Sequence, residues 1–215
     1  MTTLSRPRLG RTHHDSQRDY APIPAGPAGK PNVIYVVLDD VGYSDLGCFG
    51  SEIETPNFDS LAGRGLRFSN FHTTTLCSPT RACLLTGRNH HAVGMRYLAN
   101  ADMGWPSGRG AITRRAGTLA EMLRLQGYAT YAVGKWHLAP TEQANAAGPF
   151  DQWPLGRGFE RFYGFMNGGT DQYYPELFQD NHPVEPPATP EQGYHLSDDL
   201  SDRAVRYLAD RPAIW

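Results

Sequence analysis

Two segments of the sequence carry side chains that could act together on an anion. Asp39 and Asp40 are adjacent carboxylates, which repel each other and, when buried together, need a cation or a proton. Calcium and magnesium ions prefer oxygen ligands and would suit such a pair. Cys77 lies at an expected helix N-terminus, where backbone N–H groups and the helix dipole favour anions, and Arg81 follows one turn later.

A lysine and a histidine form a third polar group. Lys135 and His137 are two residues apart, so in an extended segment their side chains face the same side. An ammonium and an imidazole directed at one point suit an oxyanion. Simpler interpretations remain open for all three groups: a solvated turn for the carboxylates, a small buried apolar residue for the cysteine, and a surface lysine beside a structural histidine.

Each polar group follows an expected β-strand. The apolar, β-branched run at 33–38 predicts a strand buried on both faces, residues 66–71 alternate apolar and polar, and residues 128–133 form a third candidate. Ligands gather at the carboxyl ends of strands in parallel sheets. We therefore expect the three groups to converge at one edge of the sheet.

Helices are expected between and after these strands, from their capping residues and apolar spacing. In the helix that starts at Thr55 and Pro56, we expect Phe58, Leu61 and Ala62 to face the core. The other expected helices run from Pro79 to about Thr86, from the capping box of Thr118 to Gly127, and from Ser197 through Leu208. Residues 139–195 are expected to be mostly irregular. Strands alternating with helices predict an α/β fold with a mainly parallel central sheet flanked by helices.

Composition and charge exclude several classes of protein. The formal net charge of −2 argues against nucleic-acid binding, and the 23 glycines and 17 prolines argue against a helical bundle. No apolar run is long enough to span a membrane, so no membrane association is expected. Residues 1–31 read as a Pro/Gly-rich arm and lack the apolar core of a signal peptide, which predicts a cytoplasmic, reducing environment.

The three groups lie in motifs that resemble those of type I sulfatases. Residues 77–81 (C-S-P-T-R) are similar to the family's C-x-P-x-R signature, and residues 84–88 (L-L-T-G-R) extend the match. Residues 31–42 resemble the family's opening strand and metal-binding pair, and residues 134–138 resemble its G-K-W-H-L motif. Residues 169–177 and 193–196 are similar to the bacterial arylsulfatase branch. The likeness covers residues 31 to about 210.

The resemblance implies the alkaline-phosphatase-like α/β fold and a modified cysteine. In this family a separate maturation enzyme oxidises the residue corresponding to Cys77 to formylglycine, an aldehyde whose hydrate attacks the sulfur of a sulfate ester. The resemblance also implies Ca²⁺, rather than Mg²⁺, bound by Asp39, Asp40 and an oxygen of the modified Cys77.

The remaining candidate catalytic residues also take their roles from the resemblance. It implies that Arg81 stabilises negative charge at the modified cysteine and that Lys135 binds the sulfate group. His137 would orient or deprotonate the aldehyde hydrate. The implied activity is hydrolysis of an aryl or alkyl sulfate ester, with a small molecule as the substrate.

The family's later motifs are not found in these 215 residues. A Pro-His motif, an Asp-Asn pair that completes the calcium shell and a further lysine would be expected after residue 215. We therefore interpret residues 32–215 as the N-terminal portion of a sulfatase catalytic domain, truncated at its C-terminus. Alone it would be weakly active or inactive, and a second chain could supply the missing half. Two alternatives are a formylglycine-dependent phosphonate monoester or phosphodiester hydrolase and a non-catalytic sulfatase remnant.

Overall fold

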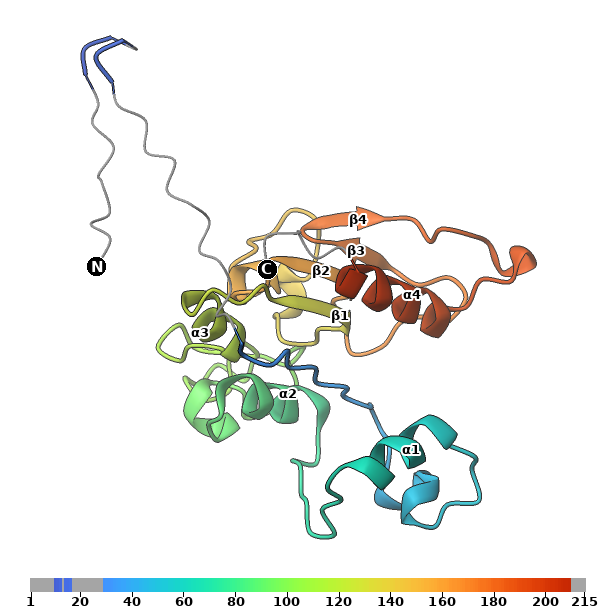
Figure 1. Ribbon diagram of the computed structural model, residues 1–215. Coiled ribbons are helices and arrows are strands. Elements are labelled where there is room, and N and C mark those ends of the chain that lie inside the picture. The colour runs from blue at the N-terminus through green and yellow to red at the C-terminus, as the bar shows by residue number, and fades with distance from the viewer. Residues whose placement is uncertain (1–9, 13, 17–28, 210–215) are drawn as a thin grey trace.

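The computed structural model describes residues 10–12, 14–16 and 29–209 (Figure 1). The predicted N-terminal arm lies largely outside the described residues. The helices are α1 (Pro56–Arg64), α2 (Cys77–Thr86), α3 (Leu119–Leu125) and α4 (Leu196–Ala209), and the strands are β1 (Tyr131–Lys135), β2 (Arg161–Phe165), β3 (Leu177–Gln179) and β4 (His182–Val184). Short 3₁₀ helices are η1 (Tyr43–Asp45), η2 (Gly47–Phe49), η3 (His90–Val93), η4 (Thr141–Gln143), η5 (Leu155–Arg157) and η6 (Pro190–Gln192).

The four strands form one mixed sheet in the order β1-β2-β3-β4. β1 and β2 are parallel, with Tyr131 opposite Arg161 and Lys135 opposite Phe165. β3 pairs antiparallel with β2 and with β4, to which it is joined by a two-residue turn where Asp180 has a φ of 56°. A connection this short can join only antiparallel strands. The predicted α/β class is confirmed. The sheet was expected to be mainly parallel, but among the described residues only the β1–β2 pair is parallel, because the short β3–β4 hairpin adds two antiparallel pairings.

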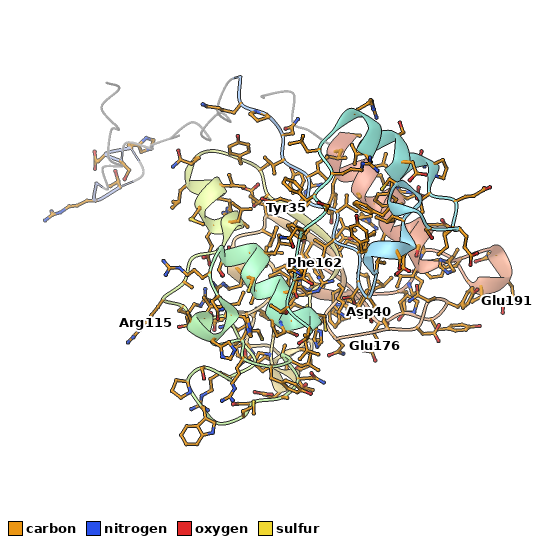
Figure 2. All side chains as sticks on the ribbon, turned by 90° about the horizontal axis from the view of Figure 1, so that it is seen from below. Tyr35, Asp40, Arg115, Phe162, Glu176 and Glu191 are labelled. Atoms are coloured by element: carbon orange, nitrogen blue, oxygen red, sulfur yellow. The ribbon has the colours of Figure 1, made fainter. Side chains whose placement is uncertain are left out.

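Successive side chains of β2 point to opposite faces of the sheet and bury two different clusters. Phe162 packs in the larger cluster together with Ala82 of α2, and Figure 2 shows Phe162 among the densely packed side chains of the interior. Tyr163 packs on the other face with Leu196 and Tyr207 of α4. Helix α4 therefore covers one face of β1 and β2, and the segment that contains α2 lies toward the other (Figure 1).

A buried arginine of η5 links the loop before α3 to α3 itself. Arg157 is 1% exposed and donates hydrogen bonds of 2.8 Å to the backbone oxygens of Ile112 and Ala116. Its Nε lies 3.3 Å from a carboxylate oxygen of Glu121 in α3. The charge of Arg157 is thus balanced inside the protein, and removing it would leave several acceptors without a donor.

The predicted strand at 33–38 is wrong, because these residues form no β-ladder in the structure. Their apolar side chains are between 41% and 68% exposed. The segment nevertheless runs alongside β1: the backbone oxygen of Pro31 accepts a 3.3 Å hydrogen bond from Tyr128, and Asp39 contacts Lys135 at the far end of β1. No backbone hydrogen bond joins the segment to β1 among the described residues, so the regular pairing that defines a strand is missing.

The predictions for residues 55–71 are confirmed only in part. A helix does begin after Thr55, and it ends at Arg64. The predicted core-facing stripe is wrong, since Leu61 is 62% exposed and no residue of α1 is buried. The predicted strand at 66–71 is also wrong, with Leu66 87% and Phe71 74% exposed. Helix α1 packs against the short η2 segment rather than against the sheet, so its apolar side has little to cover it.

The later elements agree better with the sequence. Helix α2 begins at Cys77, two residues before the predicted start, and α3 begins with the predicted capping box of Thr118 and Glu121. β1 lies a few residues later than predicted and continues to Lys135. The expectation of mostly irregular structure across 139–195 is confirmed, although the short strands β2, β3 and β4, which the sequence did not indicate, also lie there. Helix α4 is confirmed.

Candidate active site

Cys77 is the first residue of α2 and is half-buried. The next residue fixes it relative to the loop after β1: the hydroxyl of Ser78 donates a 2.8 Å hydrogen bond to the backbone oxygen of His137. The same hydroxyl accepts a 3.1 Å hydrogen bond from the backbone N–H of Ala99, and Ser78 is wholly buried. Residue 77 is therefore held against His137 by a fully satisfied buried hydroxyl.

His137 turns its imidazole toward Cys77 directly after β1 ends. Its Nδ1 lies 3.2 Å from Sγ of Cys77. The backbone N–H of Trp136 donates a 2.9 Å hydrogen bond to the backbone oxygen of Phe165, and that of His137 donates a 3.0 Å hydrogen bond to Met166. Backbone pairing with the segment that contains β2 therefore continues beyond β1. The backbone of His137 has a φ of 51°, which non-glycine residues adopt rarely and which redirects its side chain.

Lys135, Arg81 and Asp39 complete the group of charged residues. The ammonium of Lys135 is paired with the carboxylate of Asp39, and the Lys135 side chain is only 9% exposed. Arg81 donates a 2.6 Å hydrogen bond to the backbone oxygen of Lys135. The predicted convergence of the three groups is thus confirmed. Within the described residues, the contact from the acidic pair runs through Asp39, whereas Asp40 is exposed with a φ of 55°.

Burial and mutual repulsion among the cations shift two pKa values. Burial lowers the pKa of Arg81, although the charges of Asp39 and Cys77 oppose that shift. Burial, followed by the positive charges of Lys135 and Arg81, lowers the pKa of His137 to about 4. The imidazole is therefore neutral near pH 7 and able to accept a proton.

One atom of the site points to a bound ligand. Nε2 of His137 is buried and has no hydrogen-bond partner among the described residues. Buried polar atoms are nearly always satisfied, so such an atom indicates a group that the polypeptide itself does not provide. It lies near the positive charges of Lys135 and Arg81, which would attract an anion.

The acidic pair of the site could supply only some of the ligands that a hard metal ion such as calcium needs. Asp39 and Asp40 offer carboxylate oxygens, which are suitable ligands for calcium. Among residues 10–12, 14–16 and 29–209, however, no three His, Cys, Asp or Glu side chains are grouped closely enough to hold a metal ion. Calcium takes about six to eight oxygen ligands, so the described residues would supply a minority of them.

Two residues of this site escaped the sequence reasoning. Ser78 lies inside the C-S-P-T-R segment, yet nothing in the sequence indicated that its hydroxyl bridges to residue 137. Gly168 packs against the imidazole, since a Cβ added there would lie 2.8 Å from Cε1 of His137. The glycine pair that follows β2 was the available signal, because adjacent glycines often mark a close approach of backbone to another group.

Comparison with known proteins identifies the family. The sulfatase family model matches residues 31–213, so the chain belongs to the sulfatase family. It is 37% identical to an arylsulfatase of Klebsiella aerogenes, over 67% of this chain and 30% of that protein. It is 42% identical to human arylsulfatase A, over 64% of this chain and 25% of the human protein.

Solved structures support the same assignment. A protein crystallised with its substrate D-glucosamine-2-N,6-O-disulfate superimposes with a TM-score of 0.63 and 28% identity, covering 85% of this chain and 32% of that one. The alkaline-phosphatase-like fold expected of sulfatases is therefore confirmed. The chain spans about a quarter to a third of the length of the curated relatives it matches. Within its described part, no helix has the length and apolar character that crossing a bilayer requires.

Proposed function

We propose that this chain carries the nucleophile-bearing part of the active site of a sulfuric ester hydrolase, with Cys77 converted to formylglycine. The contact of Cys77 with His137, beside Lys135, Arg81 and Asp39, is the observation that carries the proposal. Formylglycine at position 77 would supply a hydrated aldehyde. One hydroxyl of this hydrate would attack the sulfur of the ester, the bond from sulfur to the ester oxygen would break, and the alcohol would leave, so that the sulfate group is transferred to residue 77. Its position at the start of α2 supports this role, since negative charge developing there is favoured by the helix N-terminus.

The chain's own side chains would handle protons and charge. His137 accepts a proton from the group at residue 77 through Nδ1, which requires the neutral imidazole that its lowered pKa of about 4 favours. Arg81 balances negative charge at residue 77, and its own position is fixed by its hydrogen bond to the Lys135 backbone. The Lys135 ammonium binds an oxygen of the sulfate group, for which its low exposure strengthens the attraction.

We further propose that Asp39 and Asp40 contribute to a calcium site beside the sulfate group. Their donor atoms suit calcium, and the metal would offset the charge of the sulfate oxygens. The carboxylate of Asp39 already contacts Lys135, so metal and lysine would share it. The remaining oxygen ligands would come from polypeptide outside these 215 residues, in the same or a second chain. On this proposal the isolated chain is weakly active or inactive.

Substrate and maturation partner belong to the same proposal. The substrate would be a small aryl or alkyl sulfate ester, and the disulfated glucosamine bound by a structurally similar protein makes sulfated sugars a candidate class. Formation of the aldehyde needs a formylglycine-generating enzyme as partner. The predicted cytoplasmic location remains a prediction.

The test is chemical analysis of residue 77. The chain would be co-expressed with a formylglycine-generating enzyme, and the peptide containing Cys77 and Cys83 would be examined by mass spectrometry. We expect aldehyde at residue 77 and a thiol at residue 83, which lies in the same helix. The Cys77→Ser variant is the control without a convertible thiol. An unmodified Cys77, when a cysteine-containing control substrate of the same enzyme is converted under the same conditions, would overturn the proposal.

A second measurement addresses substrate class. Turnover of an aryl sulfate and of a phosphonate monoester would be compared after conversion, with the chain alone and in the presence of the remaining sulfatase polypeptide of a relative. We expect the sulfate ester to be the preferred substrate wherever activity is seen. Preference for the phosphonate would favour the alternative hydrolase class instead.

A further inference from the structure

A second cationic cavity lies far from Cys77, at the C-terminal half of α4. Its volume is about 340 Å³. Its lining residues come from α4, from the beginning of β2, and from the end of β3 and the turn that follows it. The cavity is lined by Arg161, Gln179, Asp180, Arg203, Arg206 and Tyr207.

The cavity is at the opposite end of the parallel strand pair from the candidate active site. Arg161 is the first residue of β2, and it lies opposite Tyr131, the first residue of β1. Lys135 lies at the other end of β1, so about four residues of strand, or roughly 13 Å, separate the two ends. The two cationic sites therefore cannot be parts of one binding pocket for a small anion.

Aromatic rings hold two of the three guanidinium groups in place. Arg203 lies over the ring of Tyr163, with Cζ 4.0 Å from the ring centroid. Arg161 lies 5.9 Å from the ring centroid of Tyr131 and 5.5 Å from that of Tyr207. A guanidinium stacked in this way is held in a fixed orientation. The cavity is thus preorganised for an acceptor with several oxygens.

Arg203 and Arg206 place two positive charges in the lining of this cavity, beside the carboxylate of Asp180. An oxygen of this carboxylate already accepts a 2.9 Å hydrogen bond from the backbone N–H of Phe162. Among the described residues, Arg206 forms no ion pair. The surplus of positive charge favours an anionic ligand.

A buried donor in the cavity lacks a partner. Arg203 donates a 3.3 Å hydrogen bond from Nη1 to the side-chain oxygen of Gln179. Its Nε, in contrast, is buried and has no acceptor within the described part of the chain. Because a buried N–H of a charged group is costly to leave unsatisfied, this atom indicates an acceptor that the polypeptide does not supply.

We propose that this cavity binds a tetrahedral oxyanion, sulfate or phosphate, either free or as a group on a larger ester. Arg203 donates from its guanidinium, and Arg206 supplies further positive charge and donors. The planar, forked guanidinium suits such oxygens through paired hydrogen bonds. The site is separate from the candidate active site and does not depend on the modification of Cys77.

The test is calorimetric titration of the whole chain with inorganic sulfate and with inorganic phosphate, against chloride at matched ionic strength. Arg206→Gln, at an exposed position of α4, is expected to weaken oxyanion binding about tenfold, the loss typical of one charge-assisted hydrogen bond. Arg203→Gln should weaken it at least as much. Arg115→Gln removes the same charge at the periphery of the molecule (Figure 2) and should leave the affinity unchanged.

Further variants separate this cavity from the other cationic site. Lys135→Met disables the candidate active site and should leave the Arg206-dependent binding intact. The proposal is overturned if Arg206→Gln and Arg115→Gln behave alike, or if Lys135→Met abolishes all oxyanion binding. Circular dichroism of each variant identifies any that does not fold, and the exposed Arg206→Gln then provides the decisive comparison.

The source of the oxyanion is decided by a third titration. A monosaccharide sulfate that binds through the same arginines more tightly than inorganic sulfate identifies the ligand as an ester group. Equal or weaker binding of the saccharide identifies the free ion. Both results retain the site, since both require loss of affinity in Arg206→Gln.

Discussion

Replacing Gly168 by alanine tests whether packing holds the imidazole of His137 against Cys77. A Cβ at residue 168 would lie 2.8 Å from Cε1 and 3.0 Å from Nε2 of that ring. Gly168 is not among the residues with positive φ, so alanine introduces no backbone strain there. The effect of the substitution must therefore come from the contact with the ring.

The size of the effect follows from how little the ring can move. Ordinary van der Waals contact begins at 3.4 Å, so the ring has to shift by about 0.6 Å from the 2.8 Å position. His137 is 4% exposed, and its backbone is bonded to Met166 and Ser78. Overpacking of this kind costs about 1–3 kcal/mol of unfolding free energy. The 3.2 Å contact between Nδ1 and Sγ of Cys77 would be lost or lengthened.

The neighbouring residue provides a matched control. Gly169 also lacks a positive φ, and a Cβ there would meet nothing within 4 Å. The unfolding free energy of both variants would be measured in urea. The rate of iodoacetamide alkylation at Cys77 would be followed by mass spectrometry. We expect Gly168→Ala to be less stable and to change the alkylation rate, while Gly169→Ala stays within about 0.5 kcal/mol of the parent chain. Identical behaviour of the two variants would refute the proposed packing of Gly168 on His137.

Three further substitutions or conditions probe the same framework. Ser78→Ala removes the buried hydroxyl between His137 and Ala99, and leaves an acceptor and a donor unsatisfied. The unfolding free energy measured in urea should fall by about 2–4 kcal/mol. The pKa of His137 is about 4 in the folded chain and about 6.5 in the unfolded chain, so the folded state binds fewer protons between these values. Stability measured in EDTA should therefore decrease as the pH falls from about 6.5 to 4, with a slope of up to about 1.4 kcal/mol per pH unit, and His137→Gln should lack this component. Arg157→Met leaves Glu121 without its ion-pair partner and two backbone oxygens without their donor, which should lower the unfolding free energy by about 3 kcal/mol.

Each of these predictions has its own control or contrary outcome. Thr86→Val removes another buried hydroxyl of α2, whose contacts stay within its own helix end, and should cost only about 1 kcal/mol. A larger loss there than in Ser78→Ala would contradict the bridging role of Ser78. A pH dependence that persists unchanged in His137→Gln would assign the titration to another group. Arg115→Met, at an exposed position, should leave stability nearly unchanged.

The sequence was most informative where local chemistry decides the structure. The capping box at Thr118 and the glycine at 127 defined α3, because capping depends on residues only three or four apart. The charged residues of the site were also identifiable, since Cys77, Lys135 and His137 are rare residue types in short, distinctive motifs. Their convergence followed from placing each motif at the end of an expected strand.

Long-range contacts were the part that sequence could not supply. An apolar run such as residues 33–38 shows that a strand would be favourable. Whether the strand forms depends on a neighbouring strand that lies in register with it. β2, in contrast, was not predicted because its sequence lacks a regular strand pattern. Gly164 interrupts its apolar pattern, and it is needed because a Cβ there would lie 2.0 Å from the backbone oxygen of Gly134 in β1. Only the arrangement of both strands reveals why a glycine belongs in the middle of β2.

The outer edge of β1 should influence how this chain associates with other polypeptides. β1 is the terminal strand of the sheet, and among the described residues its outer N–H and C=O groups are not bonded to the apolar segment that runs beside it. Such a row of open backbone groups next to exposed valine and isoleucine side chains is a template for strand addition. Self-association of the chain should consequently rise with its concentration. A polypeptide that adds a strand beside β1 should suppress this self-association.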